Sequence, residues 1–261
     1  MSQPHPLHSE PVPPTALIVV AAGQGTRMRA GTRKAYLELH ARPVLFHTLE
    51  RFRDLPFIRE RFVVVAPQDV ESVRRKWPEL ERDYAVDAVL PGGAERVYSV
   101  EAGLRAVGTV TASPSTELVA VHDAVRPLVR PAGIEAVCRR AAAIGGAILA
   151  HPISDTLKRE AAASDGTGSG DASQRSIAAT VPRAGLWAAQ TPQVFRCDWL
   201  RRAFEAWHEA GEPPVTDDAS LLERIELPVA LVAGERTNLK LTTPEDLAVA
   251  EALLTQNFGA A

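Results

Sequence analysis

The stretch Val20-Ala21-Ala22-Gly23-Gln24-Gly25-Thr26-Arg27-Met28 follows directly on the short apolar run Ala16–Val19. An apolar run that ends in glycines is typical of a buried strand leading into a loop. The glycines leave no side chain between the backbone amides and a bound anion. Arg27 adds a permanent charge with a planar set of donors suited to phosphate oxygens. The stretch therefore predicts a phosphate-binding loop, and a plain tight turn is the alternative left open by these residues alone.

Two other nucleotide-binding loops fit this stretch poorly. A dinucleotide fingerprint needs a third small residue where Met28 stands, and an acidic residue on the next strand, which begins only near Phe62. A P-loop needs Lys-Ser or Lys-Thr after its last glycine, whereas Thr26 and Arg27 follow Gly25. Both a nicotinamide dehydrogenase and a P-loop ATPase are thus disfavoured.

Apolar runs alternate with amphipathic stretches along most of the chain. We interpret as strands the runs Ala16–Val20, Phe62–Ala66, Ala85–Leu90, Leu118–His122, Ala147–Pro152 and Val229–Ala233. Helical patterns lie at about Val44–Arg53, Asp69–Lys76, Glu95–Val107, Pro131–Ala143 and Trp199–Ala210. Strands this uniformly apolar are usually covered on both faces, so we expect a Rossmann-like α/β fold whose mostly parallel sheet carries helices on both faces. Ligands of such sheets bind beyond the carboxyl ends of the strands, where the glycine loop begins.

Composition limits the classes of partner. The 261 residues are enough for one large core, and 29 basic against 32 acidic side chains give a net charge of −3, which argues against nucleic acid. No apolar run approaches the ~20 residues of a membrane span. The seven histidines and the two cysteines, Cys138 and Cys197, lack metal-ligand or disulfide spacing, so we expect no bound metal among them and a reducing, cytoplasmic location.

The domain organisation follows from composition as well. Residues 1–14 hold five prolines and are expected to form a flexible leader, followed by a single domain over residues 15–254 and a short tail over 255–261. Within that domain, residues 154–183 place two short extended pieces around a tip rich in Gly, Ser and Asp. This predicts a protruding hairpin arm, and a disordered insertion is the alternative for its tip. Thr243 and Pro244 predict the start of a terminal helix that continues through Leu254.

Cations gather next to the glycine loop. Arg27, Arg29, Arg33 and Lys34 lie within eight residues, which is denser than a solvated surface requires, although a solvated basic patch remains open. Further along, Pro91–Ser99 opens a helix with two glycines whose backbone groups are suited to reading a base edge, and a plain loop and helix start is the alternative that this stretch alone favours.

Four later stretches add polar groups. Asp123 ends a buried strand, where a carboxylate can orient a ribose hydroxyl or hold a divalent cation, and a structural pair with Arg126 is the competing interpretation. Thr191-Pro192-Gln193 and Thr216-Asp217-Asp218 offer hydroxyls and carboxylates that we expect on loops, with helix capping by Thr216 as the alternative for the second. Lys240 lies in a strand-like run and needs an anionic partner, which a phosphate would supply.

Taken in order, the motifs resemble the 2-C-methyl-D-erythritol 4-phosphate cytidylyltransferases, the nucleotidyl transfer enzymes of the non-mevalonate isoprenoid pathway. The motifs are V-A-A-G-x-G-x-R-M, Lys34, G-G-x-E-R-x-x-S, H-D-A-x-R-P, D-T-x-K-R, Arg183 with Trp187, T-P-Q, T-D-D-A-S and N-x-K-x-T, and they run from about Thr15 to Leu254. Ribitol-5-phosphate cytidylyltransferases share much of the set and remain an alternative. A transferase for GTP or UTP and a non-catalytic nucleotide-sensing protein are further alternatives.

The resemblance implies a fold of the nucleotide-diphospho-sugar transferase type and a homodimer clasped by the arm. It also implies CTP and methylerythritol phosphate as substrates and Mg²⁺ held mainly by the CTP phosphates, with no metal site of the chain's own. It assigns nucleotide binding to Ala21, Ala22, Gly23, Gly25, Arg27, Lys34, Gly93, Ser99, Asp123 and Ala124. It assigns acceptor binding to Asp123, Arg126, Thr156, Arg183, Thr191 and Lys240. The residues expected to act on the reacting phosphates are Arg27, Lys34, Arg183 and Lys240.

The chain departs from the family pattern in three places. Arg33 stands where the family usually has proline before the lysine, which predicts an added charge and a looser loop. Ala94 replaces a frequent acidic residue after the two glycines, which removes a possible contact to ribose or base. The arm tip is longer and richer in glycine than expected, so the dimer clasp is predicted to be partly mobile.

Overall fold

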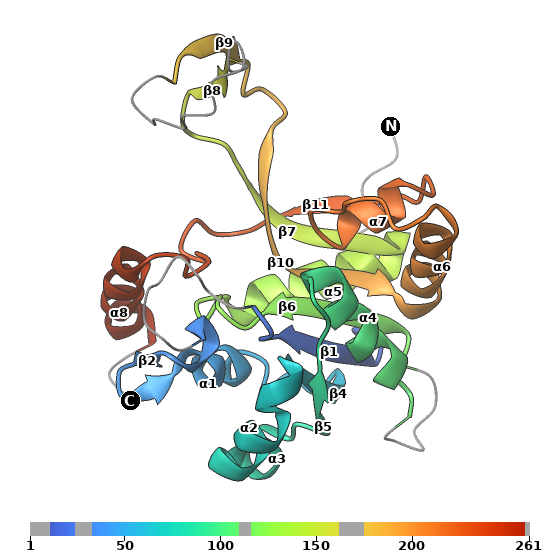
Figure 1. The fold of residues 1–261 in the computed structure, drawn as a ribbon, viewed down its shortest axis with the longest axis vertical. Helices are drawn as coiled ribbons and strands as arrows, with labels where there is room; N and C mark the ends of the chain where they lie inside the picture. Colours follow the sequence, from blue (N-terminus) through green and yellow to red (C-terminus); the bar gives the residue numbers. More distant parts are fainter. Residues whose placement is uncertain (1–10, 24–32, 110–115, 162–174, 259–261) are drawn as a thin grey trace.

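The structure is a computed structural model that describes residues 11–23, 33–109, 116–161 and 175–258. Its centre is a seven-stranded sheet in the order β11-β7-β10-β6-β1-β4-β5 (Figure 1). The strands are β1 (Thr15–Val20), β4 (Ile58–Val65), β5 (Ala88–Pro91), β6 (Leu118–Asp123), β7 (Gly146–Pro152), β10 (Trp187–Arg196) and β11 (Ala230–Ala233). β1 pairs in parallel with β4 and β6, β4 with β5, and β7 with β11, whereas β10 runs antiparallel to β6 and β7. The predicted mostly parallel sheet is confirmed.

Helices cover both faces of the sheet, as expected. Leu17 and Val19 of β1 point into one apolar core and Ala16 and Ile18 into the other, because successive side chains of a strand face opposite sides. The first core packs against α1 (Val44–Glu50), α2 (Val70–Lys76), α3 (Glu79–Tyr84) and α5 (Pro131–Ile144). The second packs against α4 (Arg96–Ala106), α6 (Cys197–Glu209) and α7 (Ala219–Glu223). In the described part of the chain, no helix combines the length and apolarity needed to cross a bilayer.

The C-terminal helix forms a smaller third cluster. α8 (Pro244–Phe258) packs beside the short strands β2 (Glu38–Leu39) and β3 (Arg42–Pro43), with Leu241 and Leu254 among the buried side chains. Its start lies at Pro244 as predicted, and the Asp246 carboxylate accepts the backbone N–H groups of Thr242 and Thr243 at 2.6 and 2.8 Å. The helix continues past Leu254, so the expected tail from residue 255 is wrong for residues 255–258.

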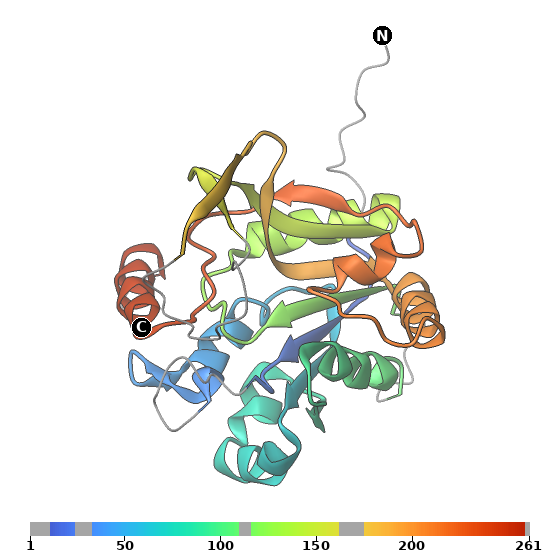
Figure 2. The same cartoon turned by 45° about the horizontal axis from the view of Figure 1, so that its top comes forward.

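The predicted arm is a hairpin that stands away from the main body (Figures 1 and 2). β8 (Leu157–Glu160) pairs antiparallel with β9 (Ile177–Val181). Ile177 on β9 is a large apolar side chain that is 65% exposed. The glycine-rich tip on which the mobile clasp was predicted lies mostly outside the described residues.

Two sequence-based interpretations are corrected. Thr191-Pro192-Gln193 lies inside β10, in the middle of the sheet, and not on a loop. The strand tolerates Pro192 because its pairing with β7 shifts register between Ala189 and Gln193, and a bulge is where proline is accommodated in a sheet. Lys240 lies in irregular backbone between β11 and α8 rather than in a strand.

Candidate active site

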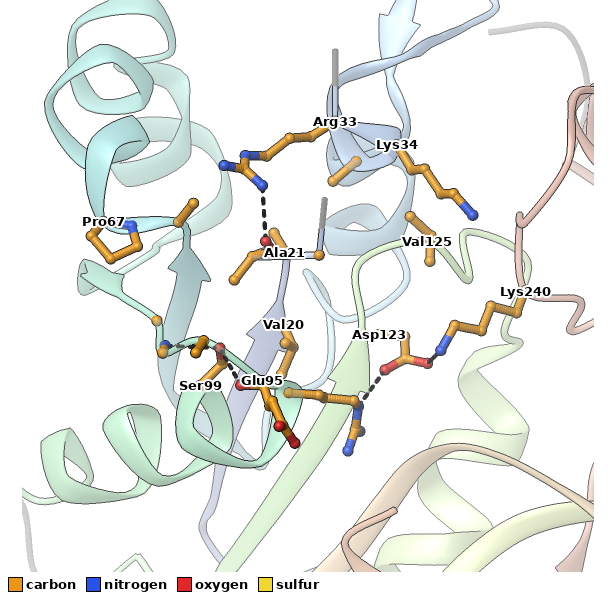
Figure 3. Close-up of a pocket in the computed structure, with 18 of the residues that line it drawn as sticks. Val20, Ala21, Arg33, Lys34, Pro67, Glu95, Ser99, Asp123, Val125 and Lys240 are labelled. Carbon is orange, nitrogen blue, oxygen red and sulfur yellow. Dashed lines mark hydrogen bonds and ion pairs between the residues drawn. The ribbon is translucent and has the colours of Figure 1, made fainter. Parts of the chain in front are cut away.

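A cavity of about 700 Å³ opens at the carboxyl ends of four parallel strands (Figure 3). Residues directly after β1, β4, β5 and β6 line it, together with the segments around Lys34 and Lys240. This is the position that the sheet topology favours for a ligand, and the volume lies within the range of small-molecule sites. The charged side chains among the described lining residues are four cations and two acids: Arg33, Lys34, Arg96 and Lys240 with Glu95 and Asp123. The excess of cations suits a polyanionic ligand.

The loop after β5 is held against the first turn of α4. The backbone N–H of Gly93 donates to Ser99 Oγ at 3.2 Å, and Ser99 Oγ in turn donates to the Glu95 carbonyl at 3.3 Å. Glycine is required at position 93 because a Cβ there would collide with the Cβ of Tyr98. The close approach leaves backbone groups of residues 92–95 at the cavity wall, beside Ala21 and Ala22 from the end of β1.

Arg33 and Lys34 form the opposite wall, at the start of the short 3-10 helix η2 (Lys34–Tyr36) (Figure 3). Arg33 donates through Nη1 to the Ala22 carbonyl at 3.0 Å and pairs through Nε with the Asp69 carboxylate. Arg33 thereby ties η2 to the loop after β1 and to η3 (Pro67–Asp69). Its backbone φ of −71° is close to the value that a proline would impose. These contacts fix this wall of the cavity, whereas the loop for which loosening was predicted lies mostly outside the described residues.

Lys34 points its amine across the cavity towards the C-terminal part of the chain. Its Nζ donates to the Thr242 carbonyl at 2.8 Å. The half-buried side chain thus presents its charge at the cavity, between the end of β1 and the segment that carries Lys240.

Asp123 is the central anion of the far wall (Figure 3). Its carboxylate accepts Arg96 Nε at 3.0 Å on Oδ1 and Lys240 Nζ at 2.8 Å on Oδ2. Burial alone would raise the pKa of Asp123, but Arg96 and then Lys240 outweigh burial and hold the pKa well below its ordinary value. The competing interpretation was a structural pair of Asp123 with Arg126. That pair is the longest of the three ion pairs of Asp123, since Arg126 Nε lies 3.8 Å from Oδ2. The anionic partner of Lys240 in this structure is Asp123.

Thr191 contacts both the buried ring of His122 and the backbone of Asp123. Thr191 Oγ1 lies 3.0 Å from His122 Nδ1 and accepts the backbone N–H of Asp123 at 3.1 Å. His122 Nε2 lies 3.1 Å from the Arg126 carbonyl. Burial lowers the pKa of His122 to about 4, so the ring is neutral at pH 7 and can donate through Nε2 while Nδ1 accepts the threonine hydroxyl. These contacts fix the end of β6 against β10.

Over the residues that the structure describes, no group of three or more His, Cys, Asp or Glu side chains is arranged to hold a metal ion. The two carboxylates among the described cavity residues are Asp123, which is already paired, and the exposed Glu95. A divalent cation here needs most of its ligands from a bound polyphosphate.

Comparison with known proteins identifies the family. The family model of 2-C-methyl-D-erythritol 4-phosphate cytidylyltransferase matches residues 15–256. The chain belongs to this family. The enzyme of that name from Pelotomaculum thermopropionicum is 41% identical over 244 residues, which cover 94% of this chain and 95% of the relative. The enzyme from Dechloromonas aromatica is 44% identical over 239 residues, covering 91% and 96%.

A solved structure agrees with the sequence relatives. The crystal structure of 2-C-methyl-D-erythritol 4-phosphate cytidylyltransferase from Thermus thermophilus superposes with a TM-score of 0.68 at 31% identity, covering 92% of this chain and 98% of that one. The similarity extends over nearly the whole chain, so the predicted family and its fold are both confirmed.

The fold brings most of the cytidylyltransferase motif residues together. Eight residues predicted from the motifs line the cavity: Ala21, Ala22, Gly23, Lys34, Gly93, Ser99, Asp123 and Lys240. Gly25 and Arg27 lie outside the described residues. Ala124 follows Asp123 but is fully buried, and its backbone N–H donates to the Val20 carbonyl.

Four predicted acceptor residues do not line the cavity of this single chain. Thr191 is buried with its hydroxyl engaged as described, and Arg126 directs Nη1 to the Asn238 carbonyl at 2.7 Å. Thr156 and Arg183 are exposed at the base of the arm, where Arg183 Nη1 donates to the Ser154 carbonyl.

Arg96 is a charged cavity residue to which the motif analysis assigned no role. It is the arginine of G-G-x-E-R-x-x-S, and its guanidinium contacts Asp123 and Asp218. A cation directly after a glycine loop at a strand end was the available signal, but its two carboxylate partners lie 27 and 122 residues away in the sequence.

Proposed function

We infer that this chain transfers the CMP group of CTP to 2-C-methyl-D-erythritol 4-phosphate, releasing pyrophosphate, as a step of the non-mevalonate isoprenoid pathway. The observation that carries this inference is a cation-rich cavity at the carboxyl ends of β1, β4, β5 and β6 in a chain of this family. We also propose a cytoplasmic location, because Cys138 and Cys197 are buried free thiols that suit a reducing compartment. Cell fractionation with an antibody to the chain tests the location.

The nucleotide is proposed to occupy the wall formed by the loops after β1 and β5. Ala21, Ala22 and Gly23 offer backbone groups on one side, and Gly93 and Ser99 on the other, and all five line the cavity. The contacts of Ser99 with Gly93 and Glu95 hold the second loop in place before a base arrives. We extend this proposal to Gly25 and Ala124 on the basis of their motif positions alone.

Charge supports the proposed handling of the phosphates. An acceptor phosphate that attacks the α-phosphorus of CTP brings two anions together, so fixed positive charge and alignment are what the protein has to supply. Lys34 lies at the cavity, and Arg27 follows the β1 loop in sequence. Mg²⁺ supplies further positive charge when it is bound. The scarcity of carboxylates among the described cavity residues fits an ion held mainly by the CTP phosphates.

The acceptor is proposed to bind on the Asp123 side. Lys240 Nζ lies 2.8 Å from Asp123, where it can hold the attacking phosphate while the carboxylate orients a hydroxyl. Arg126 and Thr191 lie behind this wall and contact its backbone and side chains. No general base is needed, because a phosphate nucleophile is already ionised.

The arm is proposed to clasp a second copy of the chain and to carry Thr156 and Arg183 to the partner's cavity. Ile177, 65% exposed, and Trp187, 38% exposed, give the arm and its base apolar contact surface. We expect the chain to sediment as a dimer and Ile177→Asp to shift it towards monomer. Val249→Asp, at an apolar and 50% exposed site on α8, is the matched control. A monomeric wild-type chain, or equal effects of the two variants, would contradict the proposal.

A substrate panel tests the activity. Pyrophosphate release from CTP is expected only when methylerythritol phosphate and Mg²⁺ are both present. Equal turnover with ribitol 5-phosphate would move the assignment to the ribitol family, and turnover with GTP or UTP would contradict the proposed base selection. Binding of CTP without turnover on any acceptor would identify a nucleotide-sensing protein instead.

A further inference from the structure

Gln193 of T-P-Q and the aspartates of T-D-D-A-S, which have no role in the proposed reaction, meet in a buried network behind the cavity. Gln193 of T-P-Q lies on β10 and accepts through Oε1 the backbone N–H groups of Asp218 and Ala219, both at 3.0 Å. Its Nε2 donates to Asp217 Oδ2 at 2.8 Å. The first turn of α7, in the motif T-D-D-A-S, is therefore fixed to the centre of the sheet.

The fixed element presents Asp218 to Arg96. The Asp218 carboxylate accepts Nη1 at 2.9 Å on one oxygen and Nη2 at 2.8 Å on the other. The side chain of Asp218 is 1% exposed and does not line the cavity, whereas that of Arg96 is 28% exposed and does. A two-point contact of this kind fixes the plane of a guanidinium as well as its position.

Arg96 connects Asp218 to Asp123, which lines the cavity. Its third nitrogen, Nε, donates to Asp123 Oδ1 at 3.0 Å, and Lys240 holds the other carboxylate oxygen. Without Asp218, Arg96 is a long side chain with several accessible rotamers. A functional group is held precisely only when neighbouring residues lock the rotamers of the side chains around it. A line of contacts thus runs from β10 through α7 and α4 to the wall that faces the acceptor.

We propose that Asp218 is a positioning residue of the transfer reaction, which orients Arg96 and, through Arg96, the Asp123 carboxylate. This rests on the proposed function, because the reaction is the readout. Asp218 touches no substrate itself, and its effect on turnover passes through the guanidinium.

A double-mutant cycle tests the proposal. In the wild-type background, Asp218→Asn is expected to lower kcat/KM for CTP by about tenfold or more per folded molecule. In an Arg96→Gln background, the same substitution is expected to change kcat/KM less than about twofold, because the residue that transmits its effect is gone. Asp217→Asn is the matched neighbour: it changes the contacts of Asp217 with Gln193 Nε2 and the Ser220 N–H but leaves the Gln193 Oε1 contacts that hold Asp218, so it is expected to change stability while kcat/KM for CTP stays within about twofold.

Each outcome decides the matter. Equal losses in both backgrounds would show that Asp218 acts by another route, and unchanged kcat and KM per folded molecule would show that it only stabilises the fold. If Asp218→Asn does not fold, the double variant, in which both buried charges are removed, is compared with Arg96→Gln, and a further fall in kcat/KM overturns the proposal. Failure of the proposed function is seen separately, as absence of turnover by the wild-type chain with CTP, methylerythritol phosphate and Mg²⁺.

Discussion

Lys34→Ala is expected to lower kcat by about 10²–10³-fold, which corresponds to about 2.7–4 kcal/mol of transition-state stabilisation, by analogy with the loss of one donor from an oxyanion hole. The reason is positional. Lys34 is the first residue of η2, and the residue before it, Arg33, is fixed by its hydrogen bond to Ala22. The Lys34 amine points into the cavity and donates to the Thr242 carbonyl. The charge is therefore held ready for the phosphates before they bind.

Folding should be nearly unchanged by this substitution, because the half-buried side chain loses one hydrogen bond to a carbonyl, worth about 1 kcal/mol. Lys34→Met keeps the apolar stem and should show the same loss of turnover. Lys76→Ala is the matched control: the side chain is exposed on α2 and its amine lies 4.9 Å from the centre of the Trp77 ring. Steady-state kinetics and thermal unfolding of the three variants measure both effects. Unchanged turnover in Lys34→Ala would remove Lys34 from the mechanism.

The strands at the cavity could be predicted because each one is specified by a short run of neighbouring residues. Runs such as Leu118–His122 are apolar almost throughout, and a buried parallel strand requires this on both faces. The residue after such a run lies at the carboxyl edge of the sheet, so Asp123 and the glycines at 92 and 93 could be placed without a structure. All three line the cavity.

The partners of those residues could not be predicted in the same way. Arg96 and Asp218 are 122 residues apart in the sequence and meet only because α4 and α7 pack on the same face of the sheet. Nothing in either local pattern distinguishes a buried two-point pair from two solvated charges. The same holds for Arg33, whose side chain donates to the carbonyl of Ala22, 11 residues earlier in the sequence.

β10 was missed for a different reason. Proline normally argues against a central strand, and Pro192 stands in the middle of this one. The shift of register between Ala189 and Gln193 is a tertiary feature, set by the pairing with β7. The arm residues present a third case, since in the proposed dimer the positions of Thr156 and Arg183 relative to a cavity depend on a second copy of the chain.

Asp123→Asn is expected to destabilise the fold by about 3 kcal/mol, because it removes a buried anion, which leaves Arg96 with Asp218 alone and takes the carboxylate away from Lys240. Arg96 and Lys240 both contact the carboxylate, and Arg126 lies 3.8 Å away. An amide can replace one hydrogen-bond acceptor but none of the charge. The same substitution should reduce turnover strongly, since Lys240 loses the group that holds it at the cavity.

The effect of Asp123→Asn on stability has a defined dependence on pH. The pKa of Asp123 in the folded chain lies well below its ordinary value, so the folded state binds fewer protons than the unfolded state when the pH falls towards and below the unfolded value of about 3.9. The carboxylate's contribution is therefore fully present at pH values clearly above 4 and is lost progressively as the pH falls. Urea unfolding at pH 7 and at pH 3 should show a larger difference between wild type and variant at pH 7.

Asp83→Asn provides the matched control for this experiment. Asp83 also pairs with an arginine, Arg82, at 2.7 Å, but their side chains are 44% and 67% exposed. An exposed pair of this kind contributes little to the free energy of unfolding, because water and salt screen it. If Asp123→Asn and Asp83→Asn cost the same free energy of unfolding at pH 7, Asp123 is not the buried anion on which the cationic wall depends, and its place at the centre of the acceptor site fails with it.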